Sequence, residues 1–269
     1  MWRAEKKQWA GVETNIYRNT DGPFDYLFLH GFLENAQMLK PVLSSLNSEI
    51  NFCAPDLPGH GKSKMIDGDS EISTLVEWLV PMLEENGRPV FIFGHSLGGY
   101  LALELAQKFP EYVGGLFLAH STATADSEVR KESREQGKRV LEMDKERYLK
   151  TAIDSLFIDS LKDVLEDEMG LMVSDALEME EANVAWYLDA MKTRNSNVQS
   201  VADRLFPLIY FSGENDPILP TSVYREEVAI TQPEKSFRTA SAGHMSHLEA
   251  PHELVSAINW TIANFGRHN

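Results

Sequence analysis

The sequence predicts an α/β protein: a mostly parallel, twisted sheet with helices on both faces and an inserted all-helical cap. Up to residue 120, short apolar runs alternate with segments of helical periodicity, and the connections between them are short. That alternation is typical of parallel strands joined by right-handed helical crossovers. Residues 121–203 break it, because they contain no proline, almost no strand signal and apolar residues at helical spacing. We therefore expect an α/β core at 1–120 and 204–269 and a helical cap at 121–203.

The elements follow from local patterns along the chain. Asn35 is a candidate helix cap, Pro41 is tolerated only in the first turns of the helix that follows, Pro81 is expected to kink its helix, and Gly87 is expected to end it. The expected strands are a hairpin or two short strands within 8–18, then 26–29, 50–54, 90–93, 113–119, 207–211 and an edge strand at 234–240. The expected helices are 35–46, 72–85, 97–109, those of the cap, 221–230 and one that begins after Pro251.

Composition limits the possible functions. The chain has 269 residues and a formal net charge of −16, which argues against a nucleic-acid partner, because phosphates are bound by clustered lysine and arginine. The single cysteine, Cys53, lies in an apolar run and is expected to be a small buried residue without a disulfide partner. The first residues are polar and no apolar run is long enough to span a bilayer. A cytoplasmic enzyme with no membrane partner is the expectation.

Residues 90–109 contain the strongest functional signal. A buried strand leads directly into a helix through Gly94-His95-Ser96-Leu97-Gly98. The glycines leave room for neighbouring backbone to pass close by, and the residue at the apex of so sharp a turn is pushed outward. This is the pattern of a nucleophile elbow, with Ser96 as the nucleophile. The N-terminus of the following helix suits an anionic intermediate.

A serine hydroxyl needs a base, and the base needs a group that fixes its tautomer. In a parallel sheet the loops after the strands gather at one edge, so the partners should directly follow strands. Asp216 follows strand 207–211 and His244 follows strand 234–240. Glu214 is the rival acid, and His247 is a less well placed rival base.

Attack on a carbonyl also needs donors for the developing oxyanion. Two backbone N–H groups are expected to supply them. One belongs to Leu97, the residue after the nucleophile, and the other to Phe32, in the loop after strand 26–29.

Five motifs together resemble the α/β-hydrolase superfamily, in its small cytoplasmic esterase-like branch with an inserted helical cap. They are FLHGF (28–32), DLPGHGKS (56–63), GHSLGG (94–99), GENDPILP (213–220) and AGHMSHLEAP (242–251). The resemblance implies Ser96 as nucleophile, Asp216 as triad acid and His244 as base. It also implies that the loop with Asp56 and His60 is structural, and we expect His95 to point away from the pocket.

We expect the protein to be a serine hydrolase that acts on carboxylic esters with small to medium acyl chains through an acyl-enzyme. The expected acyl pocket is formed by the loop residues Phe32, Leu33 and Met245 and the cap residues Trp186, Tyr187 and Met191.

Two other classes remain open. The same triad serves in C–C bond hydrolases and lyases, although Tyr100 rather than an arginine follows the elbow, which weakens a carboxylate-binding lyase. A receptor that only binds a small ligand would have no need of an intact Ser–His–Asp set. The dehalogenases of this family use an aspartate as the nucleophile, so the serine at position 96 argues against a dehalogenase. The sequence has no HExxH, paired CxxC or P-loop motif, so no metal or nucleotide cofactor is expected, and the chain is expected to be a monomer or homodimer.

Overall fold

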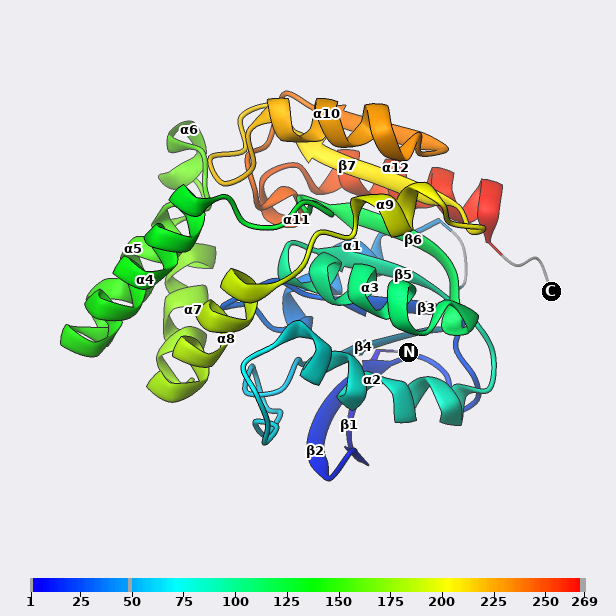
Figure 1. Ribbon diagram of the computed structural model, residues 1–269, viewed down its shortest axis with the longest axis horizontal. Helices are drawn as coiled ribbons and strands as arrows, with labels where there is room; N and C mark the ends of the chain where they lie inside the picture. The colour runs from blue at the N-terminus through cyan, green and yellow to red at the C-terminus, as the bar shows by residue number, and fades with distance from the viewer. Residues whose placement is uncertain (1, 48–49, 267–269) are drawn as a thin grey trace.

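A single eight-stranded sheet organises the protein in the computed structural model, which describes residues 2–47 and 50–266 (Figure 1). Its strand order is β1-β2-β4-β3-β5-β6-β7-β8. The strands from β4 to β8 run parallel, whereas β1 and β2 form an antiparallel hairpin that adds to the edge of β4. This confirms the predicted fold class. The strands are β1 (Arg3–Trp9), β2 (Val12–Arg18), β3 (Tyr26–Leu29), β4 (Phe52–Pro55), β5 (Val90–His95), β6 (Val113–Ala119), β7 (Leu208–Gly213) and β8 (Lys235–Thr239).

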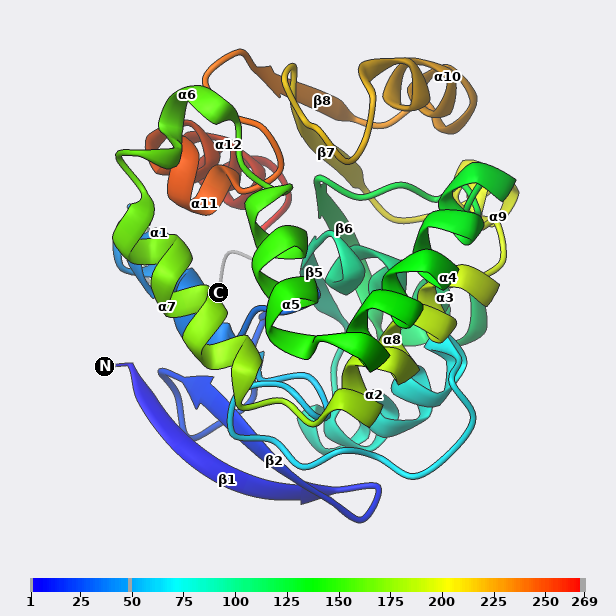
Figure 2. The same cartoon turned by 90° about the vertical axis from the view of Figure 1, so that its left-hand side faces the viewer.

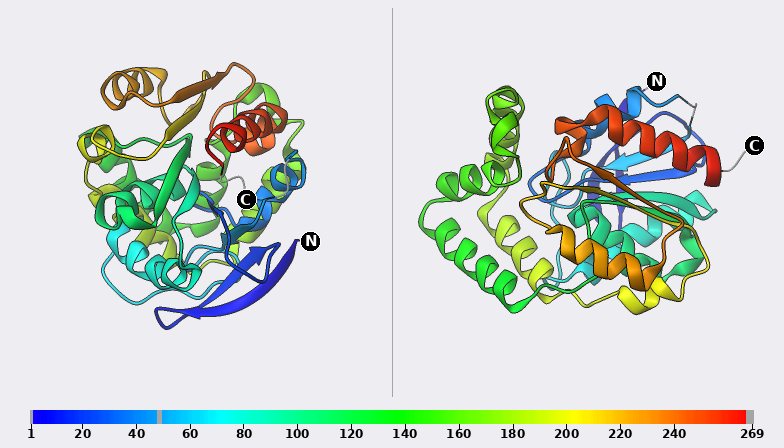
Figure 3. Two further views of the ribbon diagram at one scale, coloured as in Figure 1. Left: turned by 90° about the vertical axis from the view of Figure 1, so that its right-hand side faces the viewer. Right: turned by 90° about the horizontal axis from the view of Figure 1, so that it is seen from above.

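Helices cover both faces of the sheet (Figure 3). One face packs against α1 (Lys40–Ser44) and α12 (Pro251–Phe265), and the other against α2 (Ile72–Asn86), α3 (Leu97–Lys108) and α10 (Thr221–Thr231). Two short turns, η2 (Pro110–Tyr112) and α11 (Ser246–Glu249), precede β6 and α12. Each face therefore has its own apolar core.

The helix predicted from Asn35 to Leu46 is shorter and less regular than expected. The Asn35 side chain accepts a hydrogen bond from the Gln37 N–H and caps the 3-10 turn η1 (Ala36–Leu39), and α1 ends at Ser44. Pro41 lies in the first turn of α1, where its missing N–H leaves no donor unpaired.

Between β6 and β7 every regular element is a helix. We refer to residues 121–203 as the helical segment; it contains α4 (Glu128–Met143), α5 (Lys145–Asp154), α6 (Asp159–Lys162), α7 (Glu166–Leu177), α8 (Glu181–Thr193) and α9 (Val198–Ala202). Helices α4 to α8 gather at one end of the sheet (Figure 2), and residues of α4, α5, α7 and α8 form an apolar cluster that also includes Leu33 and Met245. Helix α9 instead packs against α3 and α10. No helix in 2–47 or 50–266 is both long and apolar enough to span a membrane.

The helical segment leaves and rejoins the sheet at one place. The N–H of Asn197 donates to the carbonyl of Ala123 at 2.7 Å, which joins the two connections directly. Glu227 of α10 ties this junction to the sheet. Its buried carboxylate accepts hydrogen bonds from the Ala123 N–H at 2.8 Å and from the hydroxyl of Tyr210 in β7.

Candidate active site

Ser96 occupies the sharp turn between β5 and α3. Its backbone has φ +47° and ψ −112°, a conformation that L-residues rarely adopt. The glycines on either side permit this turn. A Cβ on Gly94 would lie 2.6 Å from the Cα of Gly99, and one on Gly98 would lie 2.3 Å from the Leu29 carbonyl oxygen. The local sequence thus allows the strained turn on which the Ser96 side chain is displayed.

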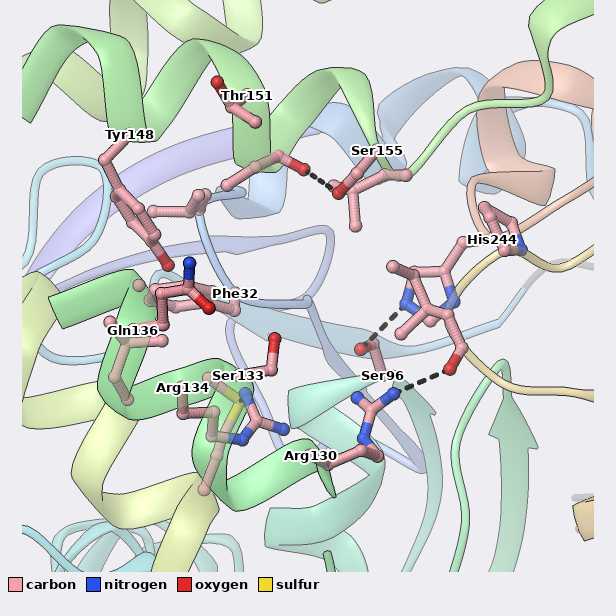
Figure 4. Close-up of a pocket in the computed structure, with 18 of the residues that line it drawn as sticks. Phe32, Ser96, Arg130, Ser133, Arg134, Gln136, Tyr148, Thr151, Ser155 and His244 are labelled. Carbon is pink, nitrogen blue, oxygen red and sulfur yellow. Dashed lines mark hydrogen bonds between the residues drawn. The ribbon is translucent and has the colours of Figure 1, made fainter. Parts of the chain in front are cut away.

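Three residues predicted from separate loops come together at this point. The Ser96 Oγ lies 3.0 Å from Nε2 of His244 (Figure 4), and Nδ1 of the same ring lies 3.1 and 3.0 Å from the two carboxylate oxygens of Asp216. The N–H groups of Ile218 and Leu219 donate to Oδ1 of Asp216 at 2.8 and 2.9 Å, which fixes the carboxylate. With Nδ1 protonated to donate to Asp216, Nε2 is left free to accept the Ser96 proton.

His120 is a fourth member of this network that the sequence analysis missed. It directly follows β6 with φ +49°, is fully buried, and its Nδ1 lies 3.0 Å from Oδ2 of Asp216. Its Nε2 lies 2.5 Å from the Ser246 hydroxyl. The signal that identified Asp216 and His244 also applies to His120, because it stands at the carboxyl end of a parallel strand.

The electrostatics of Asp216 favour its ionised form. Burial raises the pKa of this carboxyl, but the charge of His244 and hydrogen bonds from His120 and His244 outweigh burial and hold the pKa well below its usual range. Burial lowers the pKa of His120 to about 4 despite its contact with Asp216, so this imidazole is neutral near pH 7. The site therefore contains a fixed carboxylate charge between two rings.

The two rival residues lie elsewhere. Glu214 forms an ion pair with Arg238 at 3.3 Å on the surface. His247 is buried against Glu34 and the ring of His95, with its Nε2 3.8 Å from the Glu34 carboxylate. Within the described residues, neither makes a hydrogen bond to Ser96 or to the His244 ring.

The His95 side chain points away from Ser96 and contacts the main chain of His244. Its Nε2 lies 2.9 Å from the His244 carbonyl oxygen and its Nδ1 lies 2.8 Å from Oε1 of Glu34. Burial lowers the pKa of His95, but the adjacent Glu34 carboxylate outweighs this and raises the pKa above the ordinary histidine value. The pair thus favours a buried imidazolium–carboxylate contact beneath the candidate base.

The loop after β3 is held so that one of its N–H groups stays unpaired. The Leu33 N–H donates to His60 Nε2 at 3.3 Å and the Gly31 N–H donates to Glu34 at 3.2 Å. Across residues 2–47 and 50–266, the N–H groups of Phe32 and Leu97 have no hydrogen-bond acceptor. Both residues border the Ser96 turn and are therefore available as oxyanion donors.

The loop with Asp56 and His60 joins the framework of the site. Asp56 accepts hydrogen bonds from the Ala36 N–H, the Asn15 side chain and the Lys62 N–H at 2.9, 2.8 and 3.0 Å. Both residues are buried; Asp56 bonds to strand β2, to η1 and to its own loop, and His60 bonds to neighbouring loops, which agrees with the structural role expected of them.

A cavity of about 570 Å³ opens above Ser96 and His244 (Figure 4). Its floor includes Phe32 and Leu33, and its remaining walls come from α4, α5 and α8 of the helical segment and from the loop at 217–218. The volume lies within the range usual for small-molecule sites.

Three of the six residues predicted to form the pocket do not line it, namely Trp186, Tyr187 and Met245, and that part of the prediction is wrong. Trp186 faces the loop at residue 68, where its indole Nε1 donates to the Gly68 carbonyl at 3.1 Å. Met245 is completely buried in the apolar cluster of the helical segment. Tyr187 of the same prediction is also fully buried, with its hydroxyl bonded to the Pro58 carbonyl at 2.7 Å, whereas Met191 does line the cavity.

Two buried groups contain the residue types that bind metals. They are Glu34, His95 and His247, and His120, Asp216 and His244, each with donor atoms within 4.8 Å of one another. In the second group both rings are hydrogen-bonded to the carboxylate, and in the first group His95 and His247 lie 2.8 and 3.8 Å from the Glu34 carboxylate, so we interpret both groups as part of the polar framework around Ser96.

A serine at a strand–helix elbow, with a histidine and a carboxylate at the same sheet edge, is the arrangement of α/β hydrolases. A model of the alpha/beta hydrolase family matches residues 26–257. The chain belongs to the alpha/beta hydrolase family.

Curated relatives match part of the chain. Esterase Rv0045c of Mycobacterium tuberculosis is 32% identical over 173 residues, which are 62% of this chain and 57% of the esterase. Lipase LipV of the same organism is 36% identical over 117 residues, 43% of this chain and 44% of the lipase. The matched segments thus span about half the length of these relatives.

Solved structures match over nearly the whole chain. A thermophilic esterase from Thermogutta terrifontis, described as malate bound, has a TM-score of 0.86 at 22% identity over 98% of this chain and 100% of its own. An enol-lactonase from Burkholderia xenovorans LB400 has a TM-score of 0.83 at 16% identity over 97% and 99% of the two chains. At these identities the likeness shows the shared fold.

Proposed function

We propose that this protein is a serine hydrolase that cleaves carboxylic esters with small to medium acyl chains through an acyl-enzyme. The observation that supports this most strongly is the continuous chain of contacts from Ser96 through His244 to Asp216, at 3.0 Å for each step, at the floor of a cavity. The esterase and lipase relatives, by their names, support ester substrates.

In the proposed reaction, His244 Nε2 takes the Ser96 proton as the oxygen attacks the ester carbonyl. Asp216 stabilises the imidazolium that forms, and the N–H groups of Phe32 and Leu97 donate to the oxyanion. His244 then protonates the leaving alcohol. Water, activated by the same ring, attacks the acyl-enzyme and releases the acid and Ser96.

The helical segment acts as a cap in this proposal. Helices α4, α5 and α8 supply most of the cavity wall above Ser96, so they would contact the substrate and limit its access to water. Phe32, Leu33 and Met191 contribute to the apolar lining of the proposed acyl pocket, together with residues such as Val140 and Leu188.

The test compares the wild-type protein with Ser96→Ala. We expect p-nitrophenyl butyrate to give a burst of one p-nitrophenolate per active site, and a fluorophosphonate probe to label the wild-type protein. Both signals should vanish in Ser96→Ala, with thermal unfolding used to confirm that the variant is folded. Equal turnover by the two proteins would overturn the proposal.

The same experiment separates the alternatives. Labelling without ester turnover, together with cleavage of a C–C diketone, would replace ester hydrolysis with C–C hydrolysis by the same serine. An intact wild-type protein that is neither labelled nor active would point to a ligand-binding member of the family.

A further inference from the structure

The cavity above Ser96 is lined by an excess of positive charge, although the whole chain has a net charge of −16. Its lining contains three arginines, Arg130, Arg134 and Arg147, but only one acidic residue, Glu34. Glu34 is buried and already faces His95 at 2.8 Å. Acidic residues outnumber basic ones in the whole chain, whereas basic residues outnumber acidic ones in the lining of this cavity.

The arginines are incompletely neutralised. Arg130 and Arg134 of α4 and Arg194 all contact the same buried carboxylate, Asp126, at 3.4, 2.5 and 2.5 Å. Three cations on one anion leave a local excess of two positive charges. Arg147 on α5 has no ion-pair partner among the described residues and is exposed at the cavity.

Arg130 is held beside the proposed triad. Its Nη1 donates to the Ile218 carbonyl at 2.7 Å, and the N–H of Ile218 donates to Asp216. Figure 4 shows its guanidinium group directed toward Ser96 and His244. In the described structure its Nη2 has no hydrogen-bond acceptor, so a planar donor faces the space next to the reacting hydroxyl.

Neutral polar groups surround the same space. Ser133, Gln136 and Thr151 line the cavity, and so does Tyr148, whose pKa burial raises to about 12. The tyrosine hydroxyl is therefore a donor at neutral pH. Arginine and hydroxyl donors that outnumber the acids beside them are suited to a carboxylate, which accepts up to four hydrogen bonds.

We propose that the substrate is an ester that carries a carboxylate group, and that Arg130 and Arg147 bind this carboxylate while Ser96 attacks the ester carbonyl. This inference rests on the proposed ester hydrolysis and narrows its substrate class. Hydrolysis consumes one water and yields an alcohol and an acid, and one of these products keeps the bound carboxylate.

The first experiment uses two substrate pairs that differ only in charge. Methyl hydrogen adipate is compared with methyl hexanoate, which places the carboxylate on the acyl side, and 4-acetoxybutanoate is compared with butyl acetate, which places it on the alcohol side. We expect the anionic member of at least one pair to have a kcat/KM about tenfold higher or more, the value of one charge-assisted hydrogen bond. The preference should weaken as salt is raised. Equal or lower values for both anionic esters would overturn the inference.

The second experiment assigns the preference to the two arginines. Arg130→Gln and Arg147→Gln should each lower the ratio of anionic to neutral kcat/KM, mainly through KM, and the double variant should abolish the preference. Arg139→Gln is the control, because Arg139 is an exposed arginine of α4 that does not line the cavity. A ratio that is unchanged in the double variant would contradict the assignment.

A binding measurement separates failure of this inference from failure of the proposed function. Adipate should bind Ser96→Ala in calorimetric titration, and the double arginine variant made in that background should bind it about tenfold or more weakly. Adipate binding without ester turnover by the wild-type protein would reject the hydrolase proposal alone. Ester turnover without adipate binding or anion preference would reject the carboxylate site alone.

Discussion

Asp216 Oδ2 lies 3.0 Å from Nδ1 of two rings, that of the buried His120 and that of His244. Two backbone N–H groups donate to its other oxygen. The carboxylate is therefore fixed from several sides, and the orientation of His244 depends on a ring that does not itself approach Ser96.

His120→Ala should lower kcat for p-nitrophenyl butyrate by about tenfold to hundredfold, because the buried carboxylate loses one hydrogen bond and some of its orientation. KM should change by less than about twofold, since His120 does not line the cavity. His120→Asn should recover most of kcat, because asparagine tolerates a positive φ and retains an N–H donor near the Nδ1 position. Unchanged kcat in His120→Ala would show that Asp216 does not need this second partner.

Asp216→Asn should lower kcat by roughly 10⁴-fold, because an amide neither holds the required tautomer of His244 nor stabilises its positive form. Glu214→Gln is the matched control. This rival acid is two residues away and paired with Arg238 on the surface, and its replacement should leave kcat within about twofold of the wild-type value. Steady-state kinetics on one ester measure kcat for both variants. A larger loss of kcat in Glu214→Gln than in Asp216→Asn would make Glu214 the triad acid.

Gly98→Ala should lower the free energy of unfolding by roughly 2 kcal/mol or more, because the new Cβ would lie 2.3 Å from the Leu29 carbonyl oxygen and force backbone to move. Gly170→Ala in α7 is the opposite case, since no atom outside the adjoining residues and backbone of its own helix lies within 4 Å of the added Cβ. It should raise the free energy of unfolding by roughly 0.5–1 kcal/mol through helix propensity. Urea unfolding measures both, and a stable Gly98→Ala protein would contradict the tight packing at the elbow.

Stability should fall as the pH decreases from about 6.5 to 4. Burial lowers the pKa of His60 to about 3, of His120 to about 4 and of His247 to about 3. In this range the unfolded chain binds protons at these histidines and the folded chain does not, so protonation favours unfolding. Each histidine contributes on the order of 1 kcal/mol per pH unit.

The urea midpoint, measured against pH, checks this prediction. His60→Gln should reduce the slope between pH 6.5 and 4, whereas His252→Gln, a change at an exposed position on α12, should leave it unaltered. A midpoint that stays constant across this interval would contradict the presence of neutral buried histidines.

Strand ends were the most informative feature of the sequence. Because turns after parallel strands share one edge, Asp216 and His244 could be placed near Ser96 from chain position alone. The same rule was available for His120, but the loop that begins with it, HSTATAD (120–126), lacks the glycine and proline signals that mark the other two loops. A histidine after a strand is recognisable as a partner only when its contact with Asp216 is seen.

The helical segment was harder to interpret. Its helices have apolar residues on more than one side, so spacing indicates that Trp186, Tyr187 and Met191 are packed without showing against what. The structure directs the first two toward neighbouring loops and only Met191 toward the cavity. Arg130 was missed for a related reason, since an arginine in a charged helix is normally a solvated residue and its proximity to Ser96 comes from tertiary packing.

The hydrogen bond between Asn197 and Ala123 has an evolutionary consequence. The chain leaves the sheet domain at Ala123 and returns to it at Asn197, next to the point of departure. Residues 124–196 therefore form an insertion whose two ends are adjacent. A recombination event that replaced this insertion with another whose ends are equally close would leave the spacing of β6 and β7 intact. New specificities can then arise by replacement of one module while the chemistry of the sheet edge is inherited unchanged.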